Sequence, residues 1–228
     1  MPLDFSRIRA LCFDVDGTLS DSDDLYARKY TDWLRRLRFI PHPEVVARRL
    51  VMGLESPGNA LLSLSDAVGL DGLAIPVIDW VYRHLPRRRT EYLVIPGVAE
   101  MLPRLKQRYP MAVISGRDAR NTMGFLDKCG LTPYFSVILT ALSARHTKPY
   151  PDPILLAAKM MGVPPEECLM IGDTTVDVRA AKAAGAQVIS VLCGFGEEAE
   201  LRRLGTDLIV PTTADVEQVL AGNGGSAS

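Results

Sequence analysis

Two aspartates, separated by one residue, stand where a short apolar run ends. The run Ile8–Phe13 leads into Asp14 and Asp16, and Gly17 and Thr18 follow directly. An apolar run of this length bounded by turn residues is typical of a buried strand. One carboxylate can attack an electrophile while its neighbour transfers a proton, and paired carboxylates also attract a hard cation. The stretch therefore indicates a candidate reaction centre at the end of a strand.

Three further polar segments each follow an apolar run that predicts a strand. They are Ser115–Asp118, Thr147–Pro151 and Gly172–Asp177. Because the carboxyl ends of parallel strands lie at one edge of a sheet, we expect these segments beside the aspartate pair. Lys148 and the Ser115 hydroxyl can hold anionic oxygens. Asp173, together with Asp14, can hold a divalent metal, and a set of oxygen ligands favours Mg²⁺ over zinc. Crowded carboxylates repel one another, so such a cation is needed for all of them to stay ionised.

The second part of the chain alternates helices with strands. Strands are expected at 111–114, 136–139, 168–171, 187–191 and 208–210, and helices at 98–108, 120–129, 154–161 and 178–184. This alternation is typical of right-handed βαβ units and a parallel sheet. The fold class is therefore predicted as α/β, with a Rossmann-like parallel sheet core.

A long segment without strand patterns follows the first strand. Residues 21–92 carry apolar side chains at helical spacing, which predicts a set of helices. The segment is far longer than an ordinary strand-to-helix connection, so we expect an inserted all-helical cap domain. The predicted division is a core of residues 1–20 and 93–228 with a cap of residues 21–92. Hinges near Ser20 and Tyr92 would let the cap close over the site and exclude bulk water.

Composition limits the classes of function. The 228 residues are 47% hydrophobic and 23% charged, which is enough for a substantial core and argues against global disorder. A formal net charge of −1 gives no case for a nucleic-acid or anionic-membrane partner. The four cysteines form no CxxC pair, so reduced thiols are expected rather than a zinc site or disulfides. Without a signal-peptide pattern or an apolar run of about 20 residues, we expect a soluble cytoplasmic protein.

The motifs resemble, in order, the four motifs of the haloacid dehalogenase superfamily. The matching residues are Asp14-Val-Asp-Gly-Thr, Ser115, Lys148 and Gly172-Asp173-Thr-Thr-Val-Asp177. The resemblance covers nearly the whole chain, including a helical cap inserted just after the first strand. Among the branches of the superfamily, the phosphoglycolate-phosphatase-like and β-phosphoglucomutase-like enzymes are the most similar.

The resemblance implies a covalent mechanism for the two aspartates. Asp14 would attack phosphorus and form an aspartyl-phosphate. Asp16 would protonate the leaving oxygen and then take a proton from the water that hydrolyses the intermediate. Mg²⁺ would be held by the Asp14 carboxylate, the Asp16 backbone carbonyl and Asp173.

The resemblance also implies how the phosphoryl group is held. Ser115, the backbone amides near it, including that of Gly116, and Lys148 would bind the phosphoryl oxygens, and this fits the charge neutralisation that phosphoryl transfer requires. Asp177 would orient Lys148 or a metal-bound water. An aspartate in the first turn of a helix is also favoured by the helix dipole alone, so its position is less specific.

Other residues are given local interpretations. In the cap, Arg49 and Gly53, the latter in the turn Met52–Gly58, are candidates for selecting the substrate. Arg117 and Arg120 are predicted to face solvent from a helix rather than to contact substrate. His146 is expected to be a surface or structural residue, because its spacing to the other histidines does not suit a metal site.

The sequence thus predicts a Mg²⁺-dependent phosphatase acting on a small phosphomonoester, such as a phosphoglycolate-like compound, a sugar phosphate or a nucleotide. A phosphomutase of the β-phosphoglucomutase type is an alternative, although similar mutases tend to carry histidine where this chain has Tyr26. A dehalogenase is disfavoured by Asp16, because displacing a halide leaves no alkoxide to protonate. A non-catalytic phospho-ligand-binding protein on the same fold is the third alternative. The oligomeric state is left open.

Overall fold

The computed structural model of the chain describes residues 3–21 and 92–222. The chain divides into two compact units, one formed by residues 1–21 and 92–228 and the other by residues 22–91. These bounds differ by one residue at each end from the core and cap predicted above. Arg49, Gly53 and the expected cap helices lie outside the described residues, so the helical cap stays a prediction.

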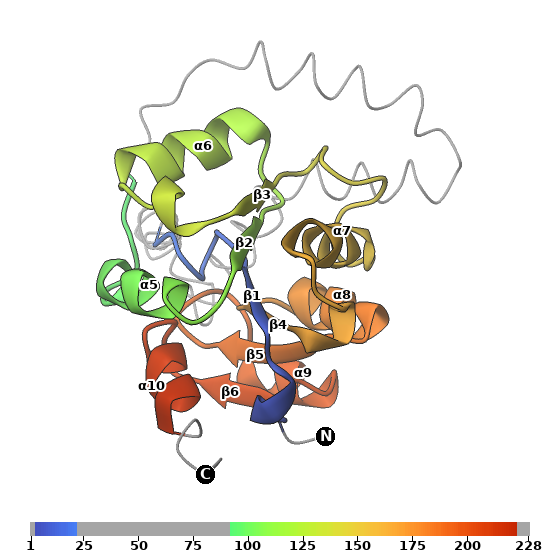
Figure 1. Cartoon of the computed structure of the whole chain (residues 1–228). Coiled ribbons are helices and arrows are strands. Elements are labelled where there is room, and N and C mark those ends of the chain that lie inside the picture. The colour runs from blue at the N-terminus through green and yellow to red at the C-terminus, as the bar shows by residue number, and fades with distance from the viewer. Residues whose placement is uncertain (1–2, 22–91, 223–228) are drawn as a thin grey trace, which may run out of the picture. The chain divides into compact units, whose positions relative to one another are not determined.

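The first unit is built on a six-stranded sheet in which all paired strands run parallel (Figure 1). Its strands are β1 (Ala10–Phe13), β2 (Met111–Ile114), β3 (Val137–Leu139), β4 (Cys168–Gly172), β5 (Gln187–Val191) and β6 (Leu208–Val210). Their order in the sheet is β3-β2-β1-β4-β5-β6, so the direction of winding reverses at β1. A reversal of this kind places a binding crevice at the carboxyl ends of the central strands.

The register keeps the carboxyl ends of the central strands level. Phe13, the last residue of β1, pairs with Val113 in β2 and with Ile171 in β4. The residues that follow β1, β2 and β4 therefore emerge at the same height on the sheet edge. This register is what brings distant polar segments to one site.

Helices cover both faces of the sheet (Figure 1). On one face, the core contains buried side chains from α5 (Val98–Lys106), α6 (Ala119–Lys128) and α10 (Asp215–Gly222). On the other face, it contains those of α7 (Asp152–Met161), α8 (Thr175–Ala184) and α9 (Glu198–Arg203). Three short 3₁₀ helices lie at Phe5–Arg7, Thr132–Tyr134 and Pro165–Glu167.

The central strand β1 is fully buried because both faces are covered. Leu11 and Phe13 point into one core, and Ala10 and Cys12 point into the other. Side chains alternate between faces along a strand, so a strand in a doubly covered sheet reads as a continuous apolar run. This explains why the four residues of β1 are all apolar, with no polar residue between them.

Most predicted elements are confirmed, and their differences have local causes. The strands at 111–114, 187–191 and 208–210 agree residue for residue. The first strand begins later than expected, because the N–H of Ile8 donates to the Phe5 carbonyl in a 3₁₀ turn. Helix α6 begins at Ala119, one residue early, because the Asp118 side chain accepts from the N–H groups of Arg120 and Asn121. Helices α9 and α10 and the three 3₁₀ helices were not predicted.

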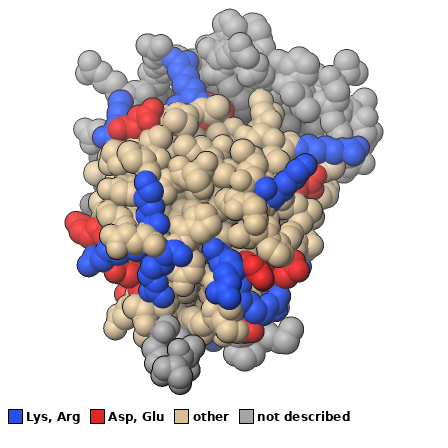
Figure 2. All heavy atoms as spheres, viewed as in Figure 1, with Lys and Arg blue, Asp and Glu red and all other residues tan. Residues whose placement is uncertain are grey.

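The surface carries charges of both signs. On the face shown in Figure 2, basic and acidic side chains lie close to one another in small groups. This distribution is in keeping with the formal net charge of −1. Among the described residues, no helix is both long enough and apolar enough to cross a bilayer.

The stability of the central strand can be tested at Phe13, whose ring lies edge-on to that of Phe135 with centroids 6.1 Å apart. We expect Phe13→Ala to lower the free energy of unfolding by about 3–5 kcal/mol, since it leaves a cavity between β1 and its covering helices. Urea unfolding followed by circular dichroism measures the change. Met160→Ala is the matched control, because that side chain is 57% exposed, and a loss of similar size there would contradict the packing described.

Candidate active site at the carboxyl edge of the sheet

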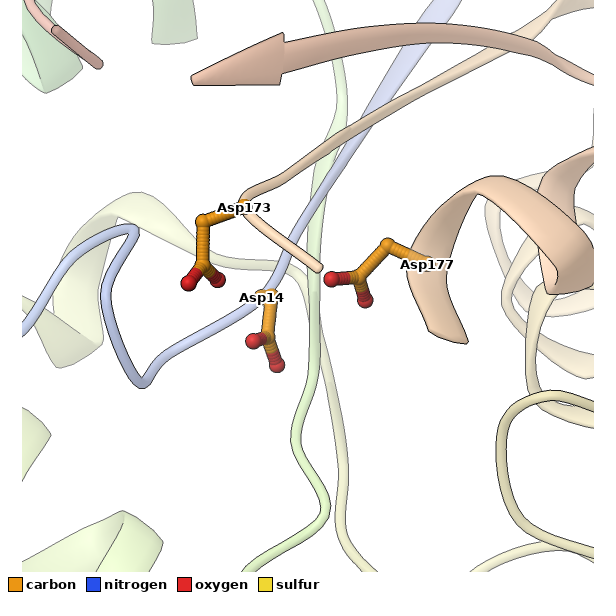
Figure 3. Close-up of side chains that lie close together, drawn as sticks. All are labelled: Asp14, Asp173 and Asp177. Carbon is orange, nitrogen blue, oxygen red and sulfur yellow. The ribbon is translucent and has the colours of Figure 1, made fainter. Parts of the chain in front are cut away.

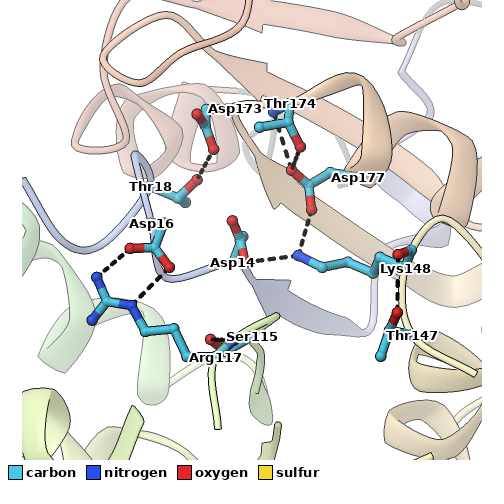
Figure 4. A network of polar contacts seen from close by, with 10 residues as sticks. All are labelled: Asp14, Asp16, Thr18, Ser115, Arg117, Thr147, Lys148, Asp173, Thr174 and Asp177. Carbon is cyan, nitrogen blue, oxygen red and sulfur yellow. Dashed lines mark hydrogen bonds and ion pairs between the residues drawn. The ribbon is translucent and has the colours of Figure 1, made fainter. Parts of the chain in front are cut away.

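The polar residues predicted to converge do lie together (Figure 4). Asp14 directly follows β1, Asp173 directly follows β4 and Ser115 directly follows β2. Lys148 comes from the loop between β3 and α7, and Asp177 from the first turn of α8. All five side chains are buried. Segments that are far apart in the chain therefore form one polar cluster at the edge of an apolar sheet.

Lys148 is the centre of this cluster. Its Nζ lies 2.7 Å from Oδ1 of Asp14 and 2.6 Å from Oδ1 of Asp177, and its side chain is 8% exposed. The other carboxylate oxygen of Asp177 accepts hydrogen bonds from the backbone N–H and the hydroxyl of Thr174. The start of α8 thus holds Asp177 in place, and Asp177 in turn holds the lysine against Asp14.

Asp173 is held by a different set of contacts. Its Oδ1 accepts a hydrogen bond from the Thr18 hydroxyl at 3.3 Å, and its Oδ2 accepts one from the backbone N–H of Phe195 at 2.8 Å. Gly17 and Gly194 pass so close to this carboxylate that a Cβ at either position would collide with it. The contact from Phe195 was not predicted, because neither a backbone donor nor a loop conformation has a side-chain signature in the sequence.

Asp14, Asp173 and Asp177 form a group suited to a cation (Figure 3). One carboxylate oxygen from each lies within 4.8 Å of the others, and all three residues are buried. Three buried carboxylates face one ammonium group, so a divalent cation with a preference for oxygen ligands would balance their charge. The Asp16 carboxylate does not belong to this group, and its predicted contribution to the metal is the backbone carbonyl.

Burial dominates the acid–base properties of this group. It raises the pKa of Asp14 to about 7, against the lowering effect of Lys148 and with a further rise from Asp177 and Asp16. Burial also raises the pKa of Asp173 well above its usual range, and the neighbouring Asp14 and Asp177 add to the rise. Burial alone would lower the pKa of Lys148, but the two carboxylates it contacts outweigh burial and raise it. Without a metal cation in addition to Lys148, the site therefore disfavours full ionisation of its carboxylates.

The loop that follows β2 supplies a hydroxyl group and an arginine. The Ser115 Oγ accepts a hydrogen bond from the backbone N–H of Arg117 at 3.0 Å, so its own proton is left to donate to a ligand. Gly116, predicted to bind phosphate through its backbone, is half-buried in the same loop. Arg117 was predicted to face solvent, and that prediction is wrong: its guanidinium pairs with the carboxylate of Asp16.

The position of Arg117 in the chain explains the error. It precedes Asp118, the residue that caps α6, so it belongs to the loop and helical periodicity does not set its direction. Arg120, on the first turn of α6, is exposed as predicted.

His146 has a structural contact, as expected. Its Nδ1 lies 3.0 Å from Oδ1 of Asp152, and its ring lies against that of Tyr150. The four cysteines are free, which also agrees with the prediction.

Comparisons with known proteins agree with this geometry. A family model described as haloacid dehalogenase-like hydrolase matches residues 11–191. The phosphoglycolate phosphatase of Nitrosococcus oceani is 32% identical over 224 residues, covering 92% of this chain and 96% of that protein. The phosphoglycolate phosphatase of Chromobacterium violaceum is 29% identical over 225 residues, covering 96% and 99%. A solved structure, a haloacid dehalogenase-like family hydrolase from Streptococcus pneumoniae, superposes with a TM-score of 0.67 at 26% identity, covering 94% of this chain and 99% of that chain.

The raised pKa of Asp14 predicts how the stability of the metal-free protein depends on pH. A folded-state pKa of about 7, against an ordinary value of 3.8, means that the folded protein binds this proton more tightly than the unfolded chain. The free energy of unfolding should therefore fall as the pH rises from about 4 to above 7. Urea unfolding in EDTA at pH 5.5 and at pH 8 measures the difference.

The same experiment on two variants tests its origin. We expect Asp14→Asn to reduce the fall in stability between the two pH values, because asparagine does not ionise. Asp127→Asn, an exposed aspartate on α6, should leave the fall unchanged. An equal fall in all three proteins would show that the pH dependence arises elsewhere.

Removal of Lys148 should be costly to the fold. In EDTA at pH 8, we expect Lys148→Met to lower the free energy of unfolding by about 3–5 kcal/mol, because it leaves buried carboxylates without their cation. Arg202→Met is the matched control: Arg202 also lies 2.6 Å from a carboxylate, that of Glu198, but the two side chains are 67% and 48% exposed. An exposed pair of this kind contributes about 0–1 kcal/mol. Equal losses in the two variants would contradict the central role of Lys148.

Proposed function

Because this chain belongs to the haloacid dehalogenase-like hydrolases, we propose that it is a Mg²⁺-dependent phosphatase that hydrolyses a small phosphomonoester through an aspartyl-phosphate. One observation carries the proposal: Asp14 lies at the end of the central strand, 2.7 Å from the Lys148 ammonium and within the three-carboxylate group. The phosphatase names of the relatives reported above support the same class of reaction.

In the proposed reaction, Asp14 is the nucleophile. A carboxylate oxygen of Asp14 forms a bond to phosphorus as the bond between phosphorus and the leaving oxygen breaks. Asp16 gives a proton to that leaving oxygen. In the second step, Asp16 takes a proton from a water molecule that attacks phosphorus, which releases phosphate and restores the Asp14 carboxylate.

The remaining residues bind and neutralise the phosphoryl group. Lys148 and the Ser115 hydroxyl are proposed to contact its anionic oxygens, together with the backbone N–H of Gly116. Lys148 is suited to this role because the carboxylates beside it keep it protonated. Preorganised donors in a buried site stabilise developing charge more strongly than they would in water.

The carboxylate group fits a hard divalent cation by its donor chemistry. We propose that the carboxylates of Asp14 and Asp173 hold Mg²⁺, together with the backbone carbonyl of Asp16. When bound, Mg²⁺ would neutralise charge on the phosphoryl oxygens and on the carboxylates around them. Asp177 is assigned to orienting Lys148, because its two oxygens already accept from Lys148 and Thr174.

The substrate class follows from the relatives and stays a proposal. 2-Phosphoglycolate is the first compound to test, and sugar phosphates and nucleotides are the alternatives. Arg49 and Gly53 remain the candidates for selecting among them, and both lie outside the described residues. The cytoplasmic location also remains a prediction, as does the absence of nucleic-acid and membrane partners.

The proposal predicts metal-dependent turnover that requires Asp14. We expect phosphate release from 2-phosphoglycolate to need Mg²⁺, to stop in EDTA and to fall at least ~10³-fold in Asp14→Asn, which removes the nucleophile. Phosphate release across a panel of phosphomonoesters is the measurement, and Asp127→Asn, outside the site, should keep native activity.

The other outcomes separate the rival functions. Equal release by the native protein and Asp14→Asn would point to another nucleophile or to contamination. Isomerisation of a sugar phosphate in the presence of a bisphosphate activator would favour the phosphomutase. Metal binding without turnover of any substrate would favour the non-catalytic binding protein.

A further inference from the structure

Two nitrogens of the Arg117 guanidinium contact the carboxylate of Asp16. Nε of Arg117 donates to Oδ2 of Asp16 at 2.8 Å, and Nη2 of Arg117 pairs with Oδ1 (Figure 4). The side chains of Arg117 and Asp16 are only 18% and 26% exposed. A bidentate contact of this kind fixes the plane of a carboxylate as well as its position.

Arg117 is itself fixed from three directions. Its backbone N–H donates to the Ser115 Oγ, and its backbone carbonyl accepts from the N–H of Ala141 at 2.9 Å. Its guanidinium carbon lies 5.9 Å from the centre of the buried Phe125 ring, over its face. The loop after β2 thus holds the Arg117 guanidinium in a fixed orientation toward Asp16, which lies in the turn after β1.

We propose that Arg117 is a positioning residue that holds the Asp16 carboxyl group in place for proton transfer to and from the reacting phosphate ester. This inference rests on the proposed function, because it takes Asp16 as the acid and base of that reaction. It assigns to the loop after β2 a second role, besides phosphate binding by Ser115 and Gly116.

The chemistry that depends on Asp16 supplies the test. Proton transfer needs a hydrogen bond of about 2.6–3.2 Å between the acid and the leaving oxygen, so a displaced Asp16 transfers its proton poorly. An alkyl phosphate needs this proton because its leaving group is a strong base. 4-Nitrophenyl phosphate needs it far less, because its leaving group is a stable phenolate.

The kinetic experiment compares kcat/KM for 2-phosphoglycolate and for 4-nitrophenyl phosphate with Mg²⁺ present. We expect Arg117→Ala to lower the value for 2-phosphoglycolate by about 10–100-fold and that for 4-nitrophenyl phosphate by less than about 3-fold. Arg117→Lys should behave like Arg117→Ala, because an ammonium cannot make the two-nitrogen contact. Arg120→Ala, on the exposed face of α6, is the matched control and should leave both values unchanged.

A second comparison tests whether Arg117 acts through Asp16 or contacts the substrate directly. In an Asp16→Asn background, Arg117→Ala should cause no further loss with 2-phosphoglycolate, since two residues that act through one group are not additive. Equal losses with the two substrates, or a further loss in the Asp16→Asn background, would mean that Arg117 contacts substrate directly and would overturn the proposal.

The contact is also tested without activity. The shifts in the urea midpoint caused by Asp16→Asn and Arg117→Ala should sum to more than the shift of the double variant, because each change removes the same ion pair. Additive shifts would overturn the Arg117–Asp16 contact. Absence of turnover by the native protein on any phosphate ester would instead overturn the proposed function, so the two failures are distinct.

Discussion

The structure depends on charge balance among buried side chains. Lys148 is one cation in contact with Asp14 and Asp177, while Asp173 lies next to them without a cationic partner of its own among the described contacts. Taking ionised groups out of water costs several kcal/mol per ion unless partners compensate. The cluster formed by these four residues therefore contains more carboxylates than cations. This excess of negative charge favours the binding of a divalent cation, and of a phosphate ester together with that cation.

The geometry of the sheet makes this arrangement of carboxylates possible. No single segment could carry so many carboxylates close together, because neighbouring residues of a strand point to opposite faces. Parallel strands in level register solve the problem by delivering one or two polar residues each to the same edge. The apolar strands below and the helices on both faces then hold the edge rigid, so each charge keeps a fixed partner.

The sequence predicted the part of this design that is encoded in side-chain type and order. Asp14, Ser115 and Asp173 each come at the end of an apolar run that predicts a strand. Their positions therefore predicted which edge of the sheet carries the site and which polar residues lie there. The sequence did not predict contacts made by loop geometry. Arg117 reads as a helix-surface residue until the cap at Asp118 is known, and the backbone N–H of Phe195 has no side-chain signal. Short peripheral helices such as α9 were also missed, because six residues carry too little periodicity to stand out.

The central place of β1 has a consequence for how the chain is made. The strand is synthesised before both of its partners in the sheet, which are residues 111–113 on one side and 168–171 on the other. Until β4 has been synthesised, β1 can pair with β2 along one edge but has no partner strand along its other edge. Long-range pairing of this kind slows folding and leaves apolar strands exposed to wrong partners. The reaction centre is thus completed only after β4 and the residues that follow it have been synthesised.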